Sequence, residues 1–316
     1  MFLKRRCARC WSRPLIAMSL WLTLVPAAPA QAPAPAARSA AAARDWAPLD
    51  RIMGRPGKLQ PGGVYKYGFP RADLHVRLDG VALRPAFALT SWVAFEARAA
   101  DTMAMGDVVL SEAEVTPVLT KVEEMGMEVT ALHNHVLRES PRVMYLHIEA
   151  EGRASEIARG LRAALALTGT PPASPPGTPS QPPPQLDTTA VKEALGYAGM
   201  VNGGVYQVSV PRAEPARAEG MEIPPAMGVA TAINFQPTGD GKAAITGDFV
   251  LTADEVNPVL RTLEEQGITV TALHSHMLTE EPRLLFMHFW ANDDAMRLAH
   301  GLRLALEHTK SKPPTP

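Results

Sequence analysis

The apolar positions between residues 46 and 167 recur first with a period of two and later with a helical period. Alternation of apolar and polar residues predicts strands over residues 64–69, 73–78, 87–96, 103–110, 128–137 and 142–150. Helical spacing predicts helices over residues 46–53, 112–125 and 154–167. This order predicts an α+β domain, in which an antiparallel sheet carries its helices packed on one face.

The middle helix has recognisable ends. Ser111 is a typical N-cap residue, and Glu112 and Glu114 follow in the first turn, where the helix dipole favours acidic side chains. Gly126 can adopt the left-handed conformation that closes many helices. We therefore expect the helix to begin after Ser111 and to end at Gly126.

The whole pattern occurs twice in the chain. The motif GGVY at residues 62–65 returns at 203–206, GD at 106–107 returns at 247–248, and TALH at 130–133 returns at 271–274. Each pair is separated by 141 residues, and the separation slips to 140 near Phe95 and Phe235. Two copies indicate a tandem duplication, since a solenoid needs at least three.

Proline-rich stretches divide the chain into segments, because such sequences form extended spacers and cannot build a packed domain. The expected organisation is a signal peptide (1–30), a Pro/Ala-rich tether (31–44), a first repeat domain (45–168), a Pro-rich linker (169–186), a second repeat domain (187–309) and a tail (310–316).

The N-terminus has the pattern of a secretory signal. A basic segment from Lys4 to Arg13 precedes an apolar run from Leu15 to Val25, and Ala28 and Ala30 follow it. The apolar run is too short to span a bilayer, which needs about 20 residues. We expect cleavage near Ala30 and export to the periplasm or the extracellular space, with no transmembrane span in the mature form. An uncleaved membrane anchor is the alternative.

Both cysteines of the chain, Cys7 and Cys10, lie inside the basic segment. No cysteine stands at the end of the apolar run, so the sequence shows no lipobox. The expected mature protein contains no cysteine, which excludes disulfide bonds and thiolate metal sites.

The charge of the chain argues against a nucleic acid partner. The formal net charge is −1, and the first thirty residues contribute five positive charges and no acid, so the remainder carries −1 − 5 = −6. A mildly acidic body without a basic stripe is unlike a nucleic-acid-binding surface.

The histidines are the most informative candidates for a functional site. His133 and His135 project from one face of a strand, because side chains alternate along it. A loop over residues 139–141 would place His133 opposite His147 and His135 opposite Tyr145. A register shifted by one residue would move His147 to the other face. The second copy repeats the set as His274, His276 and His288.

Three imidazoles on one sheet face favour a metal site in each domain. Neutral imidazole is the commonest protein ligand for several divalent transition metals, and three histidines with an open fourth position form a frequent zinc site. The metal, zinc as the first candidate, or a metal-dependent ligand would bind there. The alternative is that the histidines pack on the sheet or form the interface between the two domains.

Duplicated charged residues could assist such a site. The candidate acid–base residues are Asp107, Asp248, Glu139 and Glu280, and the candidate anion-binding residues are Arg71, Arg142, Arg212 and Arg283. Asp107 ends a predicted strand before a helix, so a turn or capping role is its alternative.

The segments GDVVLSEAEVTPVL…GMEVTALHNHVLRESPRVMYLHIEA and GDFVLTADEVNPVL…GITVTALHSHMLTEEPRLLFMHFWA resemble the LppY/LpqO family of secreted or lipoprotein-type bacterial proteins. The resemblance spans both copies and rests on the string TALH-x-H-x-L…PR…H. It implies export and tandem domains of unknown function, and it implies no particular activity.

Three hypotheses follow from the sequence. The first is an exported two-domain binding protein for a metal, a small ligand or a cell-envelope component. The second is a metal-dependent hydrolase with Glu139 or Asp107 as the base. The third is a structural or interaction protein whose two domains pair through their histidine faces. We favour binding over catalysis, and the sequence contains no nucleophile motif such as G-x-S-x-G.

Overall fold

A computed structural model describes residues 45–98, 101–172 and 185–314. The expected signal peptide, the tether up to residue 44, Cys7 and Cys10, and residues 173–184 of the expected linker lie outside these ranges. In the described part of the chain, no helix is long and apolar enough to cross a membrane.

The first repeat forms a six-stranded antiparallel sheet. Its order is β1 (Lys58–Leu59), β2 (Tyr65–Pro70), β5 (Thr90–Ala97), β6 (Thr102–Ser111), β8 (Val143–Gly152) and β7 (Glu128–His133). The second repeat forms a separate sheet of the same topology. Its order is β9 (Gly199–Asn202), β10 (Val205–Pro211), β13 (Ala230–Gly239), β14 (Lys242–Leu251), β16 (Leu285–Asp294) and β15 (Thr269–His274).

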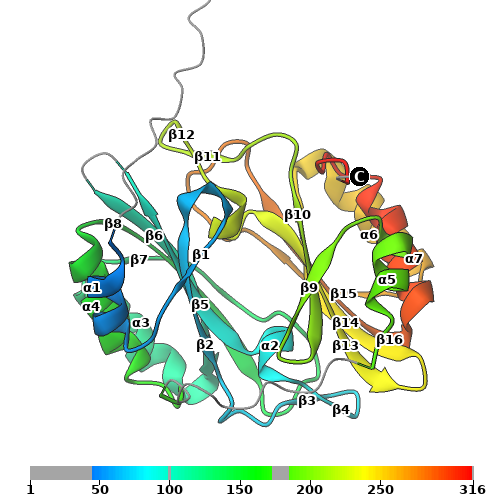
Figure 1. Ribbon diagram of the computed structural model, residues 1–316, viewed down its shortest axis with the longest axis horizontal. Coiled ribbons are helices and arrows are strands. Elements are labelled where there is room, and N and C mark those ends of the chain that lie inside the picture. Colours follow the sequence, from blue (N-terminus) through cyan, green and yellow to red (C-terminus); the bar gives the residue numbers. More distant parts are fainter. Residues whose placement is uncertain (1–44, 99–100, 173–184, 315–316) are drawn as a thin grey trace, which may run out of the picture. The chain divides into compact units, whose positions relative to one another are not determined.

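The longer helices of each repeat pack on one face of its own sheet (Figure 1). The first repeat contributes α1 (Ala47–Met53), α3 (Glu112–Glu124) and α4 (Ala154–Leu165), and the second contributes α5 (Thr188–Leu195), α6 (Ala253–Glu265) and α7 (Ala295–Leu306). Two antiparallel sheets with helices confirm the predicted α+β class. The short elements between them are η1 (Pro61–Gly63), β3 (Arg77–Leu78), β4 (Val81–Ala82), α2 (Pro85–Ala88), β11 (Arg217–Ala218), β12 (Met221–Glu222) and η2 (Pro225–Met227).

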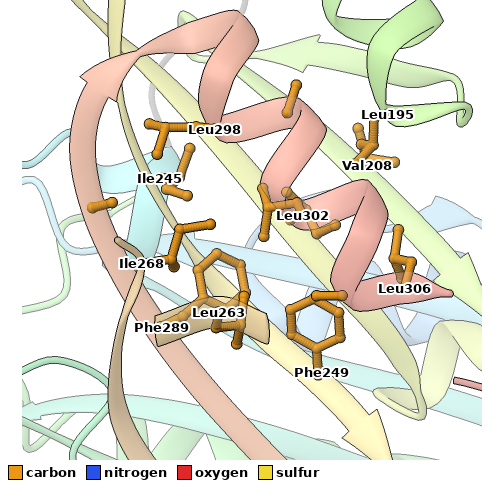
Figure 2. Close-up of a cluster of buried hydrophobic side chains, with 14 of the residues drawn as sticks. Leu195, Val208, Ile245, Phe249, Leu263, Ile268, Phe289, Leu298, Leu302 and Leu306 are labelled. Carbon is orange, nitrogen blue, oxygen red and sulfur yellow. The ribbon is translucent and has the colours of Figure 1, made fainter. Parts of the chain in front are cut away.

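The core between sheet and helices follows from the two hydrophobic periods. In the second repeat, Phe249 and Phe289 project from neighbouring strands toward Leu263 of α6 and Leu302 of α7 (Figure 2). All four side chains are fully buried. Each such side chain contributes about 1.5–3 kcal/mol by leaving water, so this layer fixes which face of the sheet the helices cover.

The ends of the middle helix, α3, agree with the ends predicted from the sequence. Ser111 and Glu114 form a capping box at the start of α3, and the Ser111 amide donates to Glu114 Oε2 over 2.7 Å. Gly126, with φ of 72°, follows the last helical turn in the left-handed conformation. Thr252 and Glu255 form the same capping box on α6.

Three predicted strands of the first repeat are shorter than expected, namely those over residues 73–78, 87–96 and 128–137. Residues 73–76 form no strand, although Val76 and Leu78 are buried. Both side chains pack in a buried cluster with Phe87, and Leu78 belongs to a small hairpin of β3 and β4 and not to the main sheet. Residues 87–88 belong to α2, which Pro85 starts because proline suits the first turn of a helix.

The register of β7 and β8 differs from the prediction by two residues. His133 lies opposite Tyr145, and Ala131 lies opposite His147. The strands end at His133 and resume at Val143, so the connection spans residues 134–142 and not the three residues expected. A shift of two preserves the side-chain face, and the three histidines therefore remain on the same side of the sheet.

The sheet faces opposite the helices pack against the other repeat. One buried cluster joins Met105 of β6 to Phe286 of β16, and another joins Tyr145 of β8 to Trp290 of β16. Corresponding hydrogen bonds cross in both directions. Lys66 Nζ donates to the Ala226 carbonyl over 3.2 Å, and Gln207 Nε2 donates to the Ala86 carbonyl over 2.7 Å.

A buried arginine ties β10 to α6 in the second repeat. Arg212 donates to Glu255 over 2.6 Å and to the Val250 carbonyl over 2.8 Å, and both charged side chains are 4 % exposed. Arg71 pairs with Glu114 and with Asp73 in the first repeat. These arginines, singled out as candidates for anion binding, thus use their guanidinium groups to connect strand and helix.

We expect Arg212→Ala to lower the free energy of unfolding by about 3–5 kcal/mol, because it leaves the buried Glu255 carboxylate without its partner. Urea unfolding measures this change. Arg153→Ala, which removes the exposed pair with Glu156, is the matched control and should change stability little. Equal losses in both variants would contradict a structural role for the Arg212 pair.

Candidate metal centre

In each repeat, three histidines come from two adjacent strands and the connection between them. His133 is the last residue of β7, His135 follows two residues later, and His147 lies in β8. Asp107 of the central strand β6 lies directly opposite His147. In the second repeat, His274, His276 and His288 occupy the same positions, and Asp248 lies opposite His288.

The two triads form a single cluster, whereas the sequence predicted one histidine patch in each domain. The ring centroids of His133 and His274 are 3.6 Å apart, those of His147 and His276 are 3.8 Å apart, and those of His135 and His288 are 4.1 Å apart. Each of these pairs joins one repeat to the other.

Two hydrogen bonds between side chains and backbone carbonyl groups hold the segment after β7 against the second repeat. Thr271 Oγ1 of β15 donates to the His135 carbonyl over 2.5 Å. Asn134 Nδ2 lies 3.5 Å from the Thr271 carbonyl oxygen. Strand β15 thus contacts both the Asn134 side chain and the His135 carbonyl.

Two of the imidazoles are also oriented through Nδ1. His133 Nδ1 lies 3.1 Å from the Asn134 carbonyl oxygen, and His288 Nδ1 lies 3.1 Å from the Gly247 carbonyl oxygen. A carbonyl accepts only from a protonated nitrogen, so these contacts assign the proton to Nδ1. Nε2 of both rings is therefore the nitrogen with a free lone pair.

Aromatic rings cover the sides of the cluster. Tyr145 stacks on His135 with ring centroids 3.3 Å apart, and Phe286 stacks on His276 at 3.7 Å. Tyr145 Oη donates to the Ala88 carbonyl over 3.0 Å, which fixes the position of its ring. His147, His276 and His288 are buried, whereas His133, His135 and His274 are partly exposed.

Five buried polar atoms of the cluster make no hydrogen bond within the described residues. They are Nε2 of His133, His135, His147 and His288, and Oδ1 of Asp107. An unsatisfied buried polar atom costs about 1–3 kcal/mol. Several such atoms at one place are unusual in a protein interior, so the cluster requires a specific explanation.

Distances within the cluster suit a shared ion. Asp107 Oδ2 lies 3.8 Å from His135 Nε2, and Asp107 Oδ1 lies 3.9 Å from His147 Nε2. These separations exceed a hydrogen bond. They are compatible with two ligands on one metal ion, since Zn–N and Zn–O bonds are about 2.0–2.2 Å long.

The histidines are neutral at neutral pH. Burial lowers the pKa of His133 to about 4, and burial together with repulsion from His133 lowers the pKa of His274 to about 3. Burial also lowers the pKa of the other four well below the usual value. Neutral imidazole is the form that binds metals.

Two acids and a lysine lie next to the histidines. Burial and repulsion from Asp248 raise the pKa of Asp107 well above its usual value, and burial raises the pKa of Asp248 to about 7. Burial lowers the pKa of Lys66 to about 8, although both aspartates favour its charged form. The Lys66 ammonium lies 3.7 Å from the centroid of the Trp92 ring.

Lys66 was not among the site residues predicted from the sequence. It differs from its counterpart in the second copy, Gln207, and comparison of the two copies could have marked it as a position of divergence.

The other predicted residues lie in the connections after β7 and β15. Glu280 is buried and accepts from the Leu284 amide over 2.9 Å and from Arg283 over 3.2 Å. Glu139, its counterpart, is also buried, and Arg142 is exposed. The structure thus brings Asp107 next to the histidine nitrogens, while Glu280 supports its own loop.

A family model described as "Domain of Unknown Function (DUF1259)" matches residues 47–167 and again residues 189–308. The matches cover more than half of the chain, and the protein therefore belongs to this family, with one copy of the domain in each repeat. The description of the family gives no activity. No curated protein matches the chain.

Two solved structures show a weak similarity. EtuB from Clostridium kluyveri shares 10% identity over 79% of this chain and 90% of its own, with a TM-score of 0.19. The trimeric bacterial microcompartment shell protein PduB shares 13% identity over 81% of this chain and 94% of its own, also with a TM-score of 0.19. These scores are too low to indicate a shared fold.

We expect the metal-free protein to lose stability as the pH falls from about 6.5 toward 4. The unfolded chain takes up protons on its histidines near pH 6.5, whereas the folded cluster resists protonation until a lower pH, for example about 4 at His133. The raised pKa values of Asp107 and Asp248 act in the opposite direction over part of this range. The six histidines decide the sign of the pH dependence, because they outnumber the two aspartates. The pKa of Lys66, about 8, lies above the pH range from 6.5 to 4.

Urea midpoints of the metal-free protein across this pH range measure the effect. His75→Ala, at an exposed histidine outside the cluster, should leave the pH dependence unchanged. A midpoint that rises on acidification would show that the cluster is not neutral in the folded state.

Proposed function

We propose that this protein binds a divalent transition metal ion in the histidine cluster between its two repeats, with zinc as the first candidate. The observation that carries the proposal is the convergence of buried Nε2 atoms and a carboxylate oxygen that make no hydrogen bond within the described residues. A metal ion would satisfy several of these atoms at once. The neutral state of the imidazoles supports the same function, because a protonated histidine cannot bind a metal.

The orientation of the rings supports metal binding as well. Metal-binding histidines usually donate their second ring nitrogen to a carbonyl or a carboxylate. His133 and His288 make such contacts through Nδ1, with the carbonyl groups of Asn134 and Gly247. Their Nε2 atoms are therefore arranged as ligands before any ion arrives.

A purely structural role is the second candidate, since the histidine rings lie between the repeats and contact one another across them. Apolar side chains would provide the same packing without unsatisfied nitrogen atoms. The clusters that join Met105 to Phe286 and Tyr145 to Trp290 already supply apolar packing. We therefore infer that packing of the repeats serves to assemble the cluster.

A metal-dependent hydrolase is the third candidate, and the position of Asp107 favours it. Its carboxylate lies within 4 Å of His135 and His147, so it could serve as the base for a metal-bound water. Three of the six histidines are buried, and Tyr145 and Phe286 cover two rings. This enclosure favours binding over turnover of a large substrate.

We further propose that the protein acts outside the cytoplasm. The signal pattern of residues 1–30 and the resemblance to the LppY/LpqO family support export. A ligand set of imidazole and carboxylate, with no cysteine after residue 10, suits an oxidising compartment, because no thiol can oxidise. The partner would be a free metal ion, a small metal-bound ligand or a cell-envelope component.

Zinc content after dialysis tests the proposal. The wild-type protein should retain zinc, and His276→Ala should weaken binding by more than the roughly 10–100-fold that follows loss of a residue that only orients a ligand. His308→Ala, at an exposed histidine outside the cluster, is the matched control and should retain zinc like the wild type. Wild-type protein that holds no zinc, copper, nickel or cobalt would refute the proposal.

Added metal should also stabilise the folded protein. A ligand that binds only the folded state at 100 times its Kd contributes about 2.7 kcal/mol. Thermal melting with Zn²⁺ should therefore show a higher Tm, which a chelator reverses. Mg²⁺, which prefers oxygen ligands, is the control and should have little effect. An equal response to both ions would indicate surface binding and not the histidine cluster.

A further inference from the structure

We propose that the cluster contains two metal positions, and that His133 lies within reach of both. This inference rests on the proposed function and adds the number and the composition of the sites. The ligand atoms of His133, His135 and His147 all lie within 4.8 Å of one another. The ligand atoms of a second set also lie within 4.8 Å of one another, and this set consists of His133, His274, His276 and His288.

The number of ligands exceeds what one zinc ion uses. Zinc in proteins takes four ligands in most sites, whereas six imidazoles converge here. The two sets share His133 and do not merge into one set of six. His274 Nε2 and His276 Nε2 lie 3.0 Å apart and contact each other. One ion in the first position would leave His288 Nε2 without a partner among the described residues, and one ion in the second would leave His135 and His147 Nε2 without one.

The first position is completed by Asp107. Its two carboxylate oxygens lie 3.8 Å from His135 Nε2 and 3.9 Å from His147 Nε2, and its Oδ1 makes no hydrogen bond within the described residues. This position therefore offers two imidazole nitrogens and a carboxylate, with His133 as a further nitrogen.

The second position differs chemically, despite the duplication. Asp248 is the counterpart of Asp107, but among the described residues its carboxylate oxygens have no histidine nitrogen within 4 Å, whereas those of Asp107 have two. The second position offers the nitrogens of His274, His276 and His288, with His133 as a fourth ligand. A mixed nitrogen and oxygen site and an all-nitrogen site should differ in affinity.

His133 lies between the two triads. Its ring centroid is 4.9 Å from that of His147 in its own repeat and 3.6 Å from that of His274 in the other. Its Nδ1 contacts the Asn134 carbonyl oxygen, so its Nε2 is the one atom it offers to either ion. A single lone pair binds one ion at a time, so loss of this ring should weaken the position that His133 completes and spare the other.

Metal stoichiometry of the purified full chain, titrated with Zn²⁺ alone, tests the inference. The wild type should bind two ions for each chain, with unequal affinities. His147→Ala should retain the second position, His288→Ala should retain the first, and His75→Ala should retain both. Asp107→Asn should weaken one position by at least about tenfold and leave the other unchanged.

A second measurement needs no variant and so does not depend on their folding. Electron paramagnetic resonance of wild-type protein loaded with two equivalents of Cu²⁺ should show spin coupling between neighbouring ions. Two-metal sites place the ions about 3.5–4 Å apart, well within the range of such coupling.

The outcomes separate this inference from the proposed function. Two ions in the wild type, one in each of His147→Ala and His288→Ala, and a coupled copper spectrum would support two positions. A single ion in the wild type would overturn the inference and leave the proposed function intact, as would two copper ions without coupling. No bound ion at all would overturn both.

Discussion

The structure depends on the pairing of two sheet faces, one from each repeat. Polar side chains are buried between these faces. The face of each sheet opposite its helices has to be covered, and the other repeat covers it with Met105, Tyr145, Phe286 and Trp290. The same packing encloses imidazoles and carboxylates that water would otherwise solvate. Burial of such groups is unfavourable unless they gain partners, so the interface calls for a ligand that can satisfy several nitrogens together.

The sequence was sufficient for features that depend on neighbours along the chain. The duplication, the capping box at Ser111 and the closing glycine at Gly126 are all local patterns. The shared face of His133 and His147 was predicted from the wrong register. The prediction of the face held because the error was two residues, and the side-chain period of a strand is also two.

The sequence offered the pairing of the two histidine faces as one hypothesis, but it could not fix which rings meet. The contact between the His133 and His274 rings joins residues of different domains, and no local period encodes such a contact. Lys66 was overlooked for a similar reason, since its importance comes from aspartates on other strands. The substitution by Gln207 shows that the copies have diverged next to the cluster while both keep their three histidines.

The central claim is that imidazole nitrogens of the cluster bind a metal ion, and X-ray absorption spectroscopy of the zinc-loaded protein tests it most directly. We predict scatterers at about 2.0–2.1 Å, the Zn–N distance, together with the outer scattering pattern of several imidazole rings. A spectrum with oxygen neighbours alone, and without imidazole scattering, would contradict the account.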